Sequence, residues 1–441
     1  MLVLGLNAYH ADASACLVED GKIVAAAEEE RFKRVKHWAG FPSEAVRYCL
    51  TERGLILSDI DHVAINSKPS ATLARRLAFV IRNQPSPRLI WERLANQSRR
   101  LSIDAELQKL HPTSKLHAQL HRVEHHTAHL ASCFLVSPFR EAVAVSVDGF
   151  GDFSSSAWGV GVEDTFQVDG RVYFPHSLGI LYQAITQHLG FPRYGDEYKV
   201  MGLAPYGEPR YLDKMRDIVS LSEDGGYQLN LDYFRHHREK VEYEWDNGQP
   251  AVGKLYSENL EELLGPARVQ EDELSQKHRD IARSVQAMYE EAFFHLLNVL
   301  QKRYGTDRLA LSGGCAMNSV ANGKVRRNTP YQQVYIQSAA GDAGGAIGAA
   351  FMAWHRLNGV NAGYLPPRSS TLDRLGGHAR SDIPRVERPE EEVKSGEKVG
   401  RFVMDHAYWG PSFNNKDIAD VLNSKRTELE QQGCSWKRIA D

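Results

Sequence analysis

The sequence predicts an α/β fold built from two similar halves with a cleft between them. An apolar strand at Leu2–Leu6 leads through a polar loop into a strand hairpin at 15–27, which turns at an Asp-Gly pair. The same order of strand, polar loop with small residues and strand returns at 142–165. Two strand–glycine–helix units follow, at 308–316 and 334–346. This repetition indicates a duplicated α/β fold.

With 441 residues, the chain is long enough for more than one domain. We expect one domain over 1–360, with lobes of roughly 1–140 and 141–360. Residues 361–400 read as a linker, because prolines, serines and glycines there precede a charged run. The segment after it, 401–441, is too short for an independent hydrophobic core.

Helices are expected where apolar residues recur three and four positions apart. This pattern extends through 273–304, and the segment 70–121 also reads as helical. Residues 218–265 are polar and irregular, which indicates an insertion between the structural elements.

The composition is that of an ordinary globular protein, with 42% hydrophobic and 25% charged residues. A net charge of −3 gives no support for nucleic-acid binding, which usually needs a basic surface. The five cysteines are far apart and form no C-x-x-C pair, which favours a reducing cytoplasm over a disulfide framework. No apolar run approaches the ~20 residues needed to span a bilayer. We therefore expect a cytoplasmic protein that binds neither nucleic acid nor membranes.

His125 and His129 are the strongest candidate metal ligands in the sequence. If Thr127–Phe134 is helical, the two imidazoles lie one turn apart on one face and can share an ion. Asp148 directly follows a predicted strand, where α/β proteins present ligands, and Asp342 lies unhindered among glycines. The alternative is a pair of hydrogen-bonded structural histidines, but the nearby strand-end carboxylate favours a metal site.

Two glycine-rich turns each follow a predicted strand and open a predicted helix. Glycine lets the backbone approach a phosphate, and the first N–H groups of a helix are free to bind it. Neither turn contains the Gly-Lys-Ser/Thr of a P-loop, and one such turn alone is commonly a plain connection. Two in succession favour phosphate binding. The candidate cofactor-binding residues are Gly313, Gly314, Asn318, Gly341 and Gly344.

Three further polar segments carry candidate catalytic residues. His10 lies in the loop after the first strand, where it can act as a general base oriented by Asp12. Capping of that loop by its own side chains is an equally good interpretation. Lys36 ends a charge run of the kind that is usually solvated, and Asp196 with Lys199 reads as a surface ion pair.

With these segments taken together, the chain resembles the NodU/CmcH-type carbamoyltransferases over nearly all of residues 1–355. The HxxxH element also occurs in the related tRNA threonylcarbamoyl-adenosine enzymes, whereas the other segments are more similar to the small-molecule carbamoyltransferases. The segments that carry the resemblance are HADAS (10–14), EEERF (28–32) with RVKH (34–37), HHTAH (125–129), VDG (147–149), YGDEYKVMGLAPYG (194–207), SGGCAMNS (312–319) and GDAGGAIGAA (341–350).

This resemblance implies the duplicated actin/hexokinase-like (ribonuclease H-like) architecture and the transfer of a carbamoyl group. A carbamoyl-adenylate, made from carbamoyl phosphate and ATP with Mg²⁺, would bind across the metal and contact the glycine turns. A hydroxyl of a sugar or natural product would attack the carbamoyl carbon, with His10 assisting its deprotonation. Asp12, Lys36 and Asp196 would position the substrates. Fe²⁺ or another divalent metal would be held by His125, His129, Asp148 and Asp342.

The end of the chain departs from the family. Family members carry a second domain that makes the carbamoyl-adenylate, and Tyr408–Phe413 resembles the opening of that domain. The sequence ends at Asp441, before the Gly-Pro-Arg-Ala-Leu-Gly motif expected there. We therefore expect 401–441 to be the start of a truncated C-terminal α/β domain, with no complete adenylation activity. A separate C-terminal chain, or a second copy in a homodimer, is the expected protein partner.

Two alternatives to a complete carbamoyltransferase stay open. The first is a nucleotide- and metal-binding remnant, or one half of a split enzyme, without full activity. The second is a phosphotransferase that resembles the sugar kinases of the same fold. The HxxxH element argues against the second alternative, because those kinases do not need two histidines on a metal.

Overall fold

The computed structural model contains two compact units, Met1–Ala407 and Tyr408–Asp441. The predicted linker at 361–400 and the part of the predicted helical segment at 84–102 lie outside the described residues. None of the helices in the described ranges is long and apolar enough to cross a membrane. The structure describes residues 1–83, 103–112, 114–239, 243–244, 248, 250–359 and 401–437.

The first sheet contains the N-terminal hairpin that the sequence predicts. β1 (Leu2–Asn7), β2 (Ser14–Glu19) and β3 (Lys22–Glu28) are antiparallel neighbours and turn at the expected Asp-Gly pair. β4 (His62–Ile65) and β5 (Gln119–Arg122) continue the sheet on the other side of β1 and run parallel to it. The strand order is β3-β2-β1-β4-β5.

The second sheet repeats this arrangement. β6 (Glu141–Gly151), β7 (Ser154–Val162) and β8 (Thr165–Tyr173) are antiparallel neighbours. β13 (Arg308–Ser312) and β14 (Gln333–Ile336) extend the sheet parallel to β6. The order β14-β13-β6-β7-β8 therefore corresponds, strand for strand, to that of the first sheet read from β5 to β3. The expected duplicated α/β fold of the actin/hexokinase type is confirmed.

β6 runs further than the sequence predicts. The pattern places the end of the strand at Val147 and a loop over 148–152. Instead the strand reaches Gly151, with an irregularity in its pairing between Val147 and Gly151. This prediction is wrong because a strand can continue through a bulge that glycines accommodate. The chain then turns at Asp152, whose φ is 46°. Asp148 consequently lies within a strand and not in a loop.

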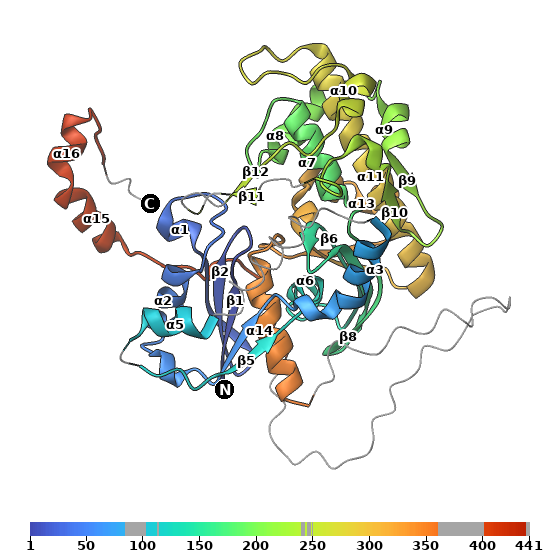
Figure 1. Cartoon of the computed structure of the whole chain (residues 1–441). Helices are drawn as coiled ribbons and strands as arrows, with labels where there is room; N and C mark the ends of the chain where they lie inside the picture. Colours follow the sequence, from blue (N-terminus) through green and yellow to red (C-terminus); the bar gives the residue numbers. More distant parts are fainter. Residues whose placement is uncertain are drawn as a thin grey trace. The chain divides into compact units, whose positions relative to one another are not determined.

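α14 (Gly344–Leu357) links the two halves of the first unit. It follows the second sheet in sequence but packs on β1, β2 and β4 of the first sheet and on α6 (His125–Phe134) (Figure 1). A Cβ on Gly348 would lie 1.8 Å from the backbone oxygen of Ala128, so the two helices can approach this closely only with glycine there. α14 therefore packs with the first sheet although it follows the second in sequence. The division into lobes at 140/141 stays a prediction.

Each sheet has its own hydrophobic core. Leu4 and Leu6 of β1 pack with Val46 and Leu50 of α2 in the first core, and α11 supplies much of the second. The predicted helix at 273–304 is confirmed as α11 (Gln276–Tyr304). The other described elements are α1 (Glu30–Lys33), α2 (Ser43–Glu52), α3 (Leu73–Asn83), α5 (Ile103–Leu110), α7 (Leu178–His188), α8 (Glu197–Leu203), α9 (Leu212–Ile218), α10 (Glu258–Leu264), α12 (Ser319–Asn322), α13 (Val325–Asn328), β9 (Val219–Leu221), β10 (Tyr227–Leu229), β11 (Tyr243–Glu244) and β12 (Ala251–Val252).

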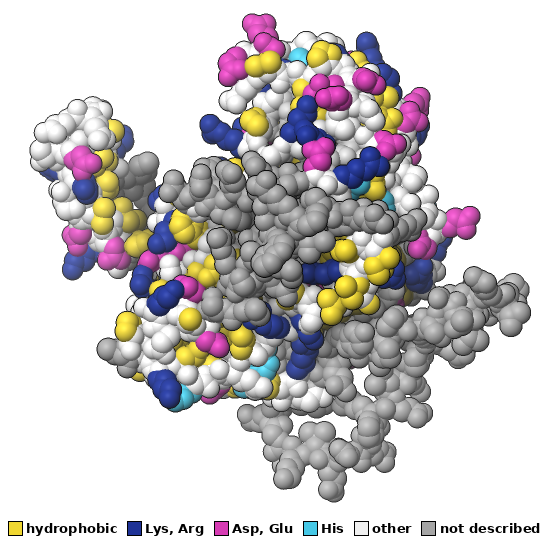
Figure 2. All heavy atoms as spheres, viewed as in Figure 1, with side chains coloured by type: hydrophobic (Ala, Val, Ile, Leu, Met, Phe, Trp, Pro, Cys, Tyr) yellow, Lys and Arg dark blue, Asp and Glu magenta, His cyan; other side chains and the backbone are white. Residues whose placement is uncertain are grey.

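The C-terminal unit contains two described helices, α15 (Asn415–Ser424) and α16 (Arg426–Gln431). None of its described residues is buried, and hydrophobic side chains are exposed on its surface (Figure 2). Ile418 and Val421 are among the exposed ones. Residues 401–407 belong to the first unit. There, the Met404 N–H donates to the backbone oxygen of Val136 at 2.8 Å. The second compact unit therefore begins at Tyr408, and the start of a C-terminal domain at 401 stays a prediction.

Candidate metal centre

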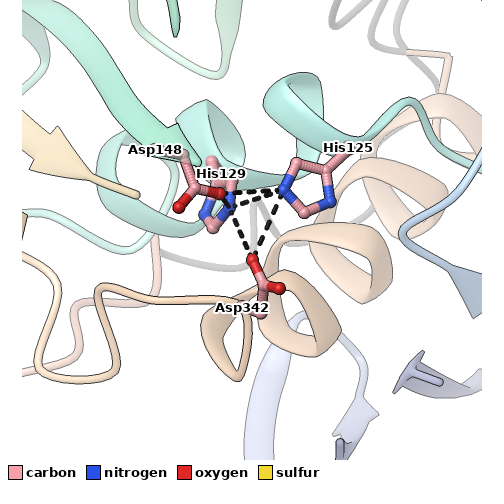
Figure 3. Close-up of side chains that lie close together, drawn as sticks. All are labelled: His125, His129, Asp148 and Asp342. Atoms are coloured by element: carbon pink, nitrogen blue, oxygen red, sulfur yellow. Dashed lines mark hydrogen bonds and ion pairs between the residues drawn. The ribbon is translucent and has the colours of Figure 1, made fainter. Parts of the chain in front are cut away.

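Four side chains from three parts of the chain converge on one point (Figure 3). His125 and His129 lie one turn apart on α6, Asp148 lies on β6, and Asp342 lies in the turn before α14. The two histidine Nε2 atoms are 3.0 Å apart. They lie 3.1 and 3.2 Å from Asp148 Oδ2, and each is 3.4 Å from Asp342 Oδ1. One ligand atom from each residue lies within 4.8 Å of all the others.

This donor set fits a divalent metal ion. Two imidazole nitrogens with carboxylate oxygens are ligands that iron, zinc and manganese accept. Both histidines are fully buried. Asp342 Oδ1 is also buried, and each Nε2 atom lies 3.4 Å from it, which is long for a hydrogen bond. Burial of a polar atom lowers the stability of the fold unless a hydrogen bond or an ion compensates for the lost contact with water. The geometry therefore supports the metal interpretation over the pair of structural histidines.

The four side chains also change one another's protonation. Burial disfavours a charged His129, but the carboxylates of Asp148 and Asp342 beside it outweigh burial and raise its pKa to about 9. Burial also opposes ionisation of Asp148, yet His125 and His129 hold its pKa well below the usual range. Burial and the charge of Asp148 raise the pKa of Asp342. Because a metal ion replaces protons on its ligands, its binding here would release protons.

A buried carboxylate fixes the start of α6. Glu124 precedes the helix and accepts the backbone N–H groups of His126 and Thr127, at 3.2 and 2.9 Å. Arg171 Nη2 lies 2.7 Å from Glu124 Oε2. Burial would raise the pKa of Glu124, but the charge of Arg171 lowers it to about 2. Glu124 is not among the residues predicted from the sequence, although an acidic residue directly before a helix is a recognisable N-cap signal.

The two glycine-rich turns lie beside the centre. The backbone N–H of Gly314 donates to Asp148 Oδ1 at 3.0 Å, which holds the carboxylate in place. Gly313 has a φ of 86°, and a Cβ on it would lie 2.3 Å from the backbone oxygen of Val147. A Cβ on Gly344 would lie 2.2 Å from another backbone oxygen. The fold therefore requires Gly313 and Gly344, whatever the turns bind.

Asn318 is held by its own side-chain hydrogen bonds. The helix predicted from Ala316 begins later, because a 3₁₀ turn over Gly314–Met317 precedes α12. Asn318 caps α12 by accepting the N–H of Ala321 at 3.0 Å. Its amide also exchanges two hydrogen bonds with Gln286 of α11, at 2.9 and 3.1 Å. The side chain thus faces α11, and a role of Asn318 in cofactor binding stays a prediction.

His10, the predicted general base, lies against the four converging side chains. Its ring centroid is 5.0 Å from that of His125, and its Nδ1 is 3.9 Å from Asp342 Oδ2. Only 8% of the residue is exposed. A general base needs to lie beside the reacting hydroxyl, and this location is compatible with that role at the centre.

Asp12 forms a close pair with His37, a residue absent from the predicted site. His37 Nδ1 lies 2.7 Å from Asp12 Oδ1, and the His37 N–H donates to Glu30 at 2.8 Å. Asp12 and His37 have φ angles of 55° and 58°, a strained region that often marks functional sites. A Cβ on Gly195 would lie 2.1 Å from His37 Nε2, and the Tyr194 ring centroid lies 5.3 Å from that of His37, so the start of the segment 194–207 lies against this pair. Lys36 is exposed in the turn before His37.

Asp196 forms an ion pair with Lys199, as the sequence predicts for these two residues. Lys199 Nζ lies 2.7 Å from Asp196 Oδ1, and the Arg193 N–H donates to the same carboxylate at 3.3 Å. These residues border a hollow that Arg268 also lines. A direct contact of Asp196 with substrate stays a prediction.

Comparisons with known proteins show what the chain is similar to. The family model described as the carbamoyltransferase N-terminus matches residues 2–351. Among solved structures, the activator of the 2-hydroxyisocaproyl-CoA dehydratase from Clostridium difficile, with bound ADPNP, is 13% identical. That match covers 81% of this chain and 96% of the activator, with a TM-score of 0.41.

Two relatives in sequence are longer than this chain. An uncharacterised protein of Synechocystis sp. is 39% identical over 366 residues, covering 80% of this chain and 57% of that protein. The nodulation protein NolNO of Sinorhizobium fredii is 33% identical over 438 residues, covering 93% of this chain and 58% of that protein. The chain therefore spans little more than half the length of these relatives.

Proposed function

Because this chain belongs to the carbamoyltransferase family whose N-terminal model matches residues 2–351, we propose that it transfers a carbamoyl group to a hydroxyl of a small-molecule acceptor. The observation that carries the proposal is the convergence of two histidines and two carboxylates on one point, with His10 beside them. Following the resemblance, the donor is a carbamoyl-adenylate made from carbamoyl phosphate and ATP with Mg²⁺. The acceptor is a sugar or another natural product.

The chemistry divides between an ion and the chain's own residues. Fe²⁺ or another divalent ion, held by His125, His129 and the two aspartates, supplies Lewis-acid polarisation of a donor oxygen when bound. His10 takes the proton of the acceptor hydroxyl as its oxygen attacks the carbamoyl carbon. The bond from that carbon to the phosphate oxygen breaks, and AMP leaves. The turn around Gly341 offers backbone N–H groups for the phosphate, and Asp12 holds the acceptor.

We assign the transfer step to residues 1–360, and we regard 361–400 as a linker to the segment 401–441. The donor-forming step belongs to a further C-terminal domain, which is supported by the greater length of the relatives. For protein partners, we propose a second copy of the chain in a homodimer or a chain that carries such a domain. The proposed location is the cytoplasm, with small-molecule substrates and without nucleic acid or membrane partners.

The test supplies the purified chain with two donors in parallel. One reaction contains carbamoyl phosphate and ATP with Mg²⁺, and the other contains preformed carbamoyl-adenylate, each with a panel of sugars. Carbamoylated sugar is detected by mass spectrometry. We expect product from carbamoyl-adenylate, and its loss in His129→Ala. The matched control is His295→Ala, because His295 of α11 lies outside the four converging side chains and its Nε2 is 2.7 Å from the backbone oxygen of Ser222.

Two results would overturn this proposal. ATP-dependent phosphorylation of a sugar would identify a phosphotransferase of the same fold. Nucleotide binding without transfer from either donor would identify a remnant of the enzyme. Product from carbamoyl-adenylate alone would support the transfer step and would place donor formation elsewhere.

A further inference from the structure

Asp152 is a buried carboxylate at the turn between β6 and β7, outside the four converging side chains. Only 1% of its side chain is exposed, and its backbone φ of 46° lies in the left-handed region. A strained backbone at a buried acidic residue persists only where the surroundings hold it firmly. The partners that hold the Asp152 side chain therefore indicate which parts of the structure it keeps in place.

One side of Asp152 contacts the metal-ligand helix. Asp152 Oδ2 accepts the backbone N–H of His125, the first residue of α6, at 3.1 Å. The next two N–H groups of the helix donate to Glu124. Two carboxylates thus satisfy the first three N–H groups of α6, which have no partner within the helix. Of the two carboxylates, Asp152 is the one that accepts the backbone N–H of His125.

The other side of Asp152 contacts a segment of the first lobe, residues 67–76. The same Oδ2 accepts the Lys68 N–H at 2.7 Å, and Oδ1 lies 3.5 Å from Ser67 Oγ. Arg76 Nη2 lies 3.9 Å from Oδ1. The Thr72 hydroxyl donates to the Asp152 backbone oxygen at 2.7 Å. A single residue therefore joins the start of α6 to a segment far away in the sequence.

We propose that Asp152 is a positioning residue: it fixes His125 for metal binding and couples the metal centre to the segment 67–76. This inference rests on the proposed function, since it requires that the centre binds a divalent ion. The coupling is reciprocal. Asp152 stabilises both the position of His125 and the ordered segment 67–76, so each of these two states favours the other. Metal binding therefore makes local opening of the segment 67–76 rarer. Conversely, a change that favours opening of that segment weakens metal binding.

The first test is titration of the metal-free full chain with Co²⁺, followed by absorption and by calorimetry. Asp152→Asn keeps the shape of the side chain but replaces one acceptor oxygen by a donor. We expect binding about 10–100-fold weaker than in the wild type, the range found when partners of metal ligands are removed. The matched control is Asp280→Asn. Asp280 is also buried, accepts a backbone N–H from Glu208 at 2.8 Å and lies 3.5 Å from Arg210.

The outcomes separate the two claims. If Co²⁺ does not bind the wild type, the proposed centre is wrong and this inference falls with it. If the wild type binds Co²⁺ and Asp152→Asn binds it equally well, only the inference is wrong. Weaker binding in Asp152→Asn but not in Asp280→Asn supports it.

The second test measures the coupling without any activity. Trypsin cleaves after the exposed Arg75 only when this part of α3 opens locally. We expect Co²⁺ to slow that cleavage in the wild type and to have a smaller effect in Asp152→Asn. Arg76→Gln, at a half-buried position, keeps the carboxylate and serves if Asp152→Asn does not fold. It should also show reduced protection by Co²⁺, and full protection in either variant contradicts the coupling.

Discussion

Replacement of Gly151 by alanine tests how tightly the strand β6 holds His125 in the proposed metal centre. A Cβ on Gly151 would lie 2.0 Å from Cδ2, 2.1 Å from Cγ and 2.5 Å from Nε2 of His125. Carbon atoms in contact prefer separations of roughly 3.5–4.0 Å, so the overlap exceeds an ångström. Gly151 pairs with Ser154 of β7, and its neighbour Asp152 is anchored, so the backbone cannot move away easily. The imidazole must swing out of the centre instead.

The expected cost follows from this geometry. Overpacking of a buried position costs about 1–3 kcal/mol, and we expect that loss in the free energy of unfolding. The displacement of one ligand should also weaken Co²⁺ binding by at least about tenfold. The control is Gly149→Ala, two residues earlier in the same strand, where a Cβ would meet nothing within 4 Å. It should bind Co²⁺ like the wild type.

Urea unfolding and Co²⁺ titration of the three proteins measure these effects. Equal affinity in Gly151→Ala and Gly149→Ala would refute the reasoning, because it would show that His125 can shift without loss of the metal site. An equal loss of Co²⁺ affinity in both variants would also refute it, because the contact of residue 151 with His125 would then not explain the weaker binding.

Two further predictions concern the fold and its dependence on pH. Gly348→Ala would place a Cβ 1.8 Å from the backbone oxygen of Ala128, so we expect thermal unfolding at a lower temperature and a loss of at least about 2 kcal/mol; an unchanged melting temperature would contradict the helix contact. Burial opposes a charged His37, but its hydrogen bond to Asp12 raises the pKa above the ordinary value, with Glu28, Glu30 and Glu197 also nearby. The pair therefore stabilises the fold below about pH 6.5, and this contribution is lost as the pH rises through the folded-state pKa. His37→Gln should accordingly lower the melting temperature more at pH 6 than at pH 9, and an equal difference at both would contradict this assignment.

The architecture and the four converging residues were accessible from the sequence for physical reasons. The repeated strand patterns predict two sheets of like topology, because periodicity reports which faces of a strand are buried. His125 and His129 are four residues apart on a helix, and Asp148 directly follows the apolar run 142–147 of β6. Such local spacing is sufficient to place side chains near one another.

The remaining features depend on tertiary contacts that local patterns do not contain. The packing of α14 depends on close approaches that only the folded structure shows. A Cβ on Gly5 of β1 would lie 2.0 Å from the backbone oxygen of Ala346 in α14, and a Cβ on Gly348 would lie 1.8 Å from that of Ala128 in α6. His37 and Asp152 act through partners distant in sequence, Asp12 at 25 residues and Lys68 at 84. The extension of β6 to Gly151 depends on a bulge, because pairing with β7 overrides the loop preference of glycine.

The most direct test of the central claim is the coordination of a metal ion by the full chain. X-ray absorption of the Co²⁺- or Fe²⁺-loaded protein reports the ligands, and titration reports the affinity. We predict about one ion per chain, with two imidazole nitrogens and carboxylate oxygens around it, and loss of this signal in His129→Ala but not in His295→Ala. An ion bound without imidazole ligands, or equally well in His129→Ala, would contradict the assignment of this centre.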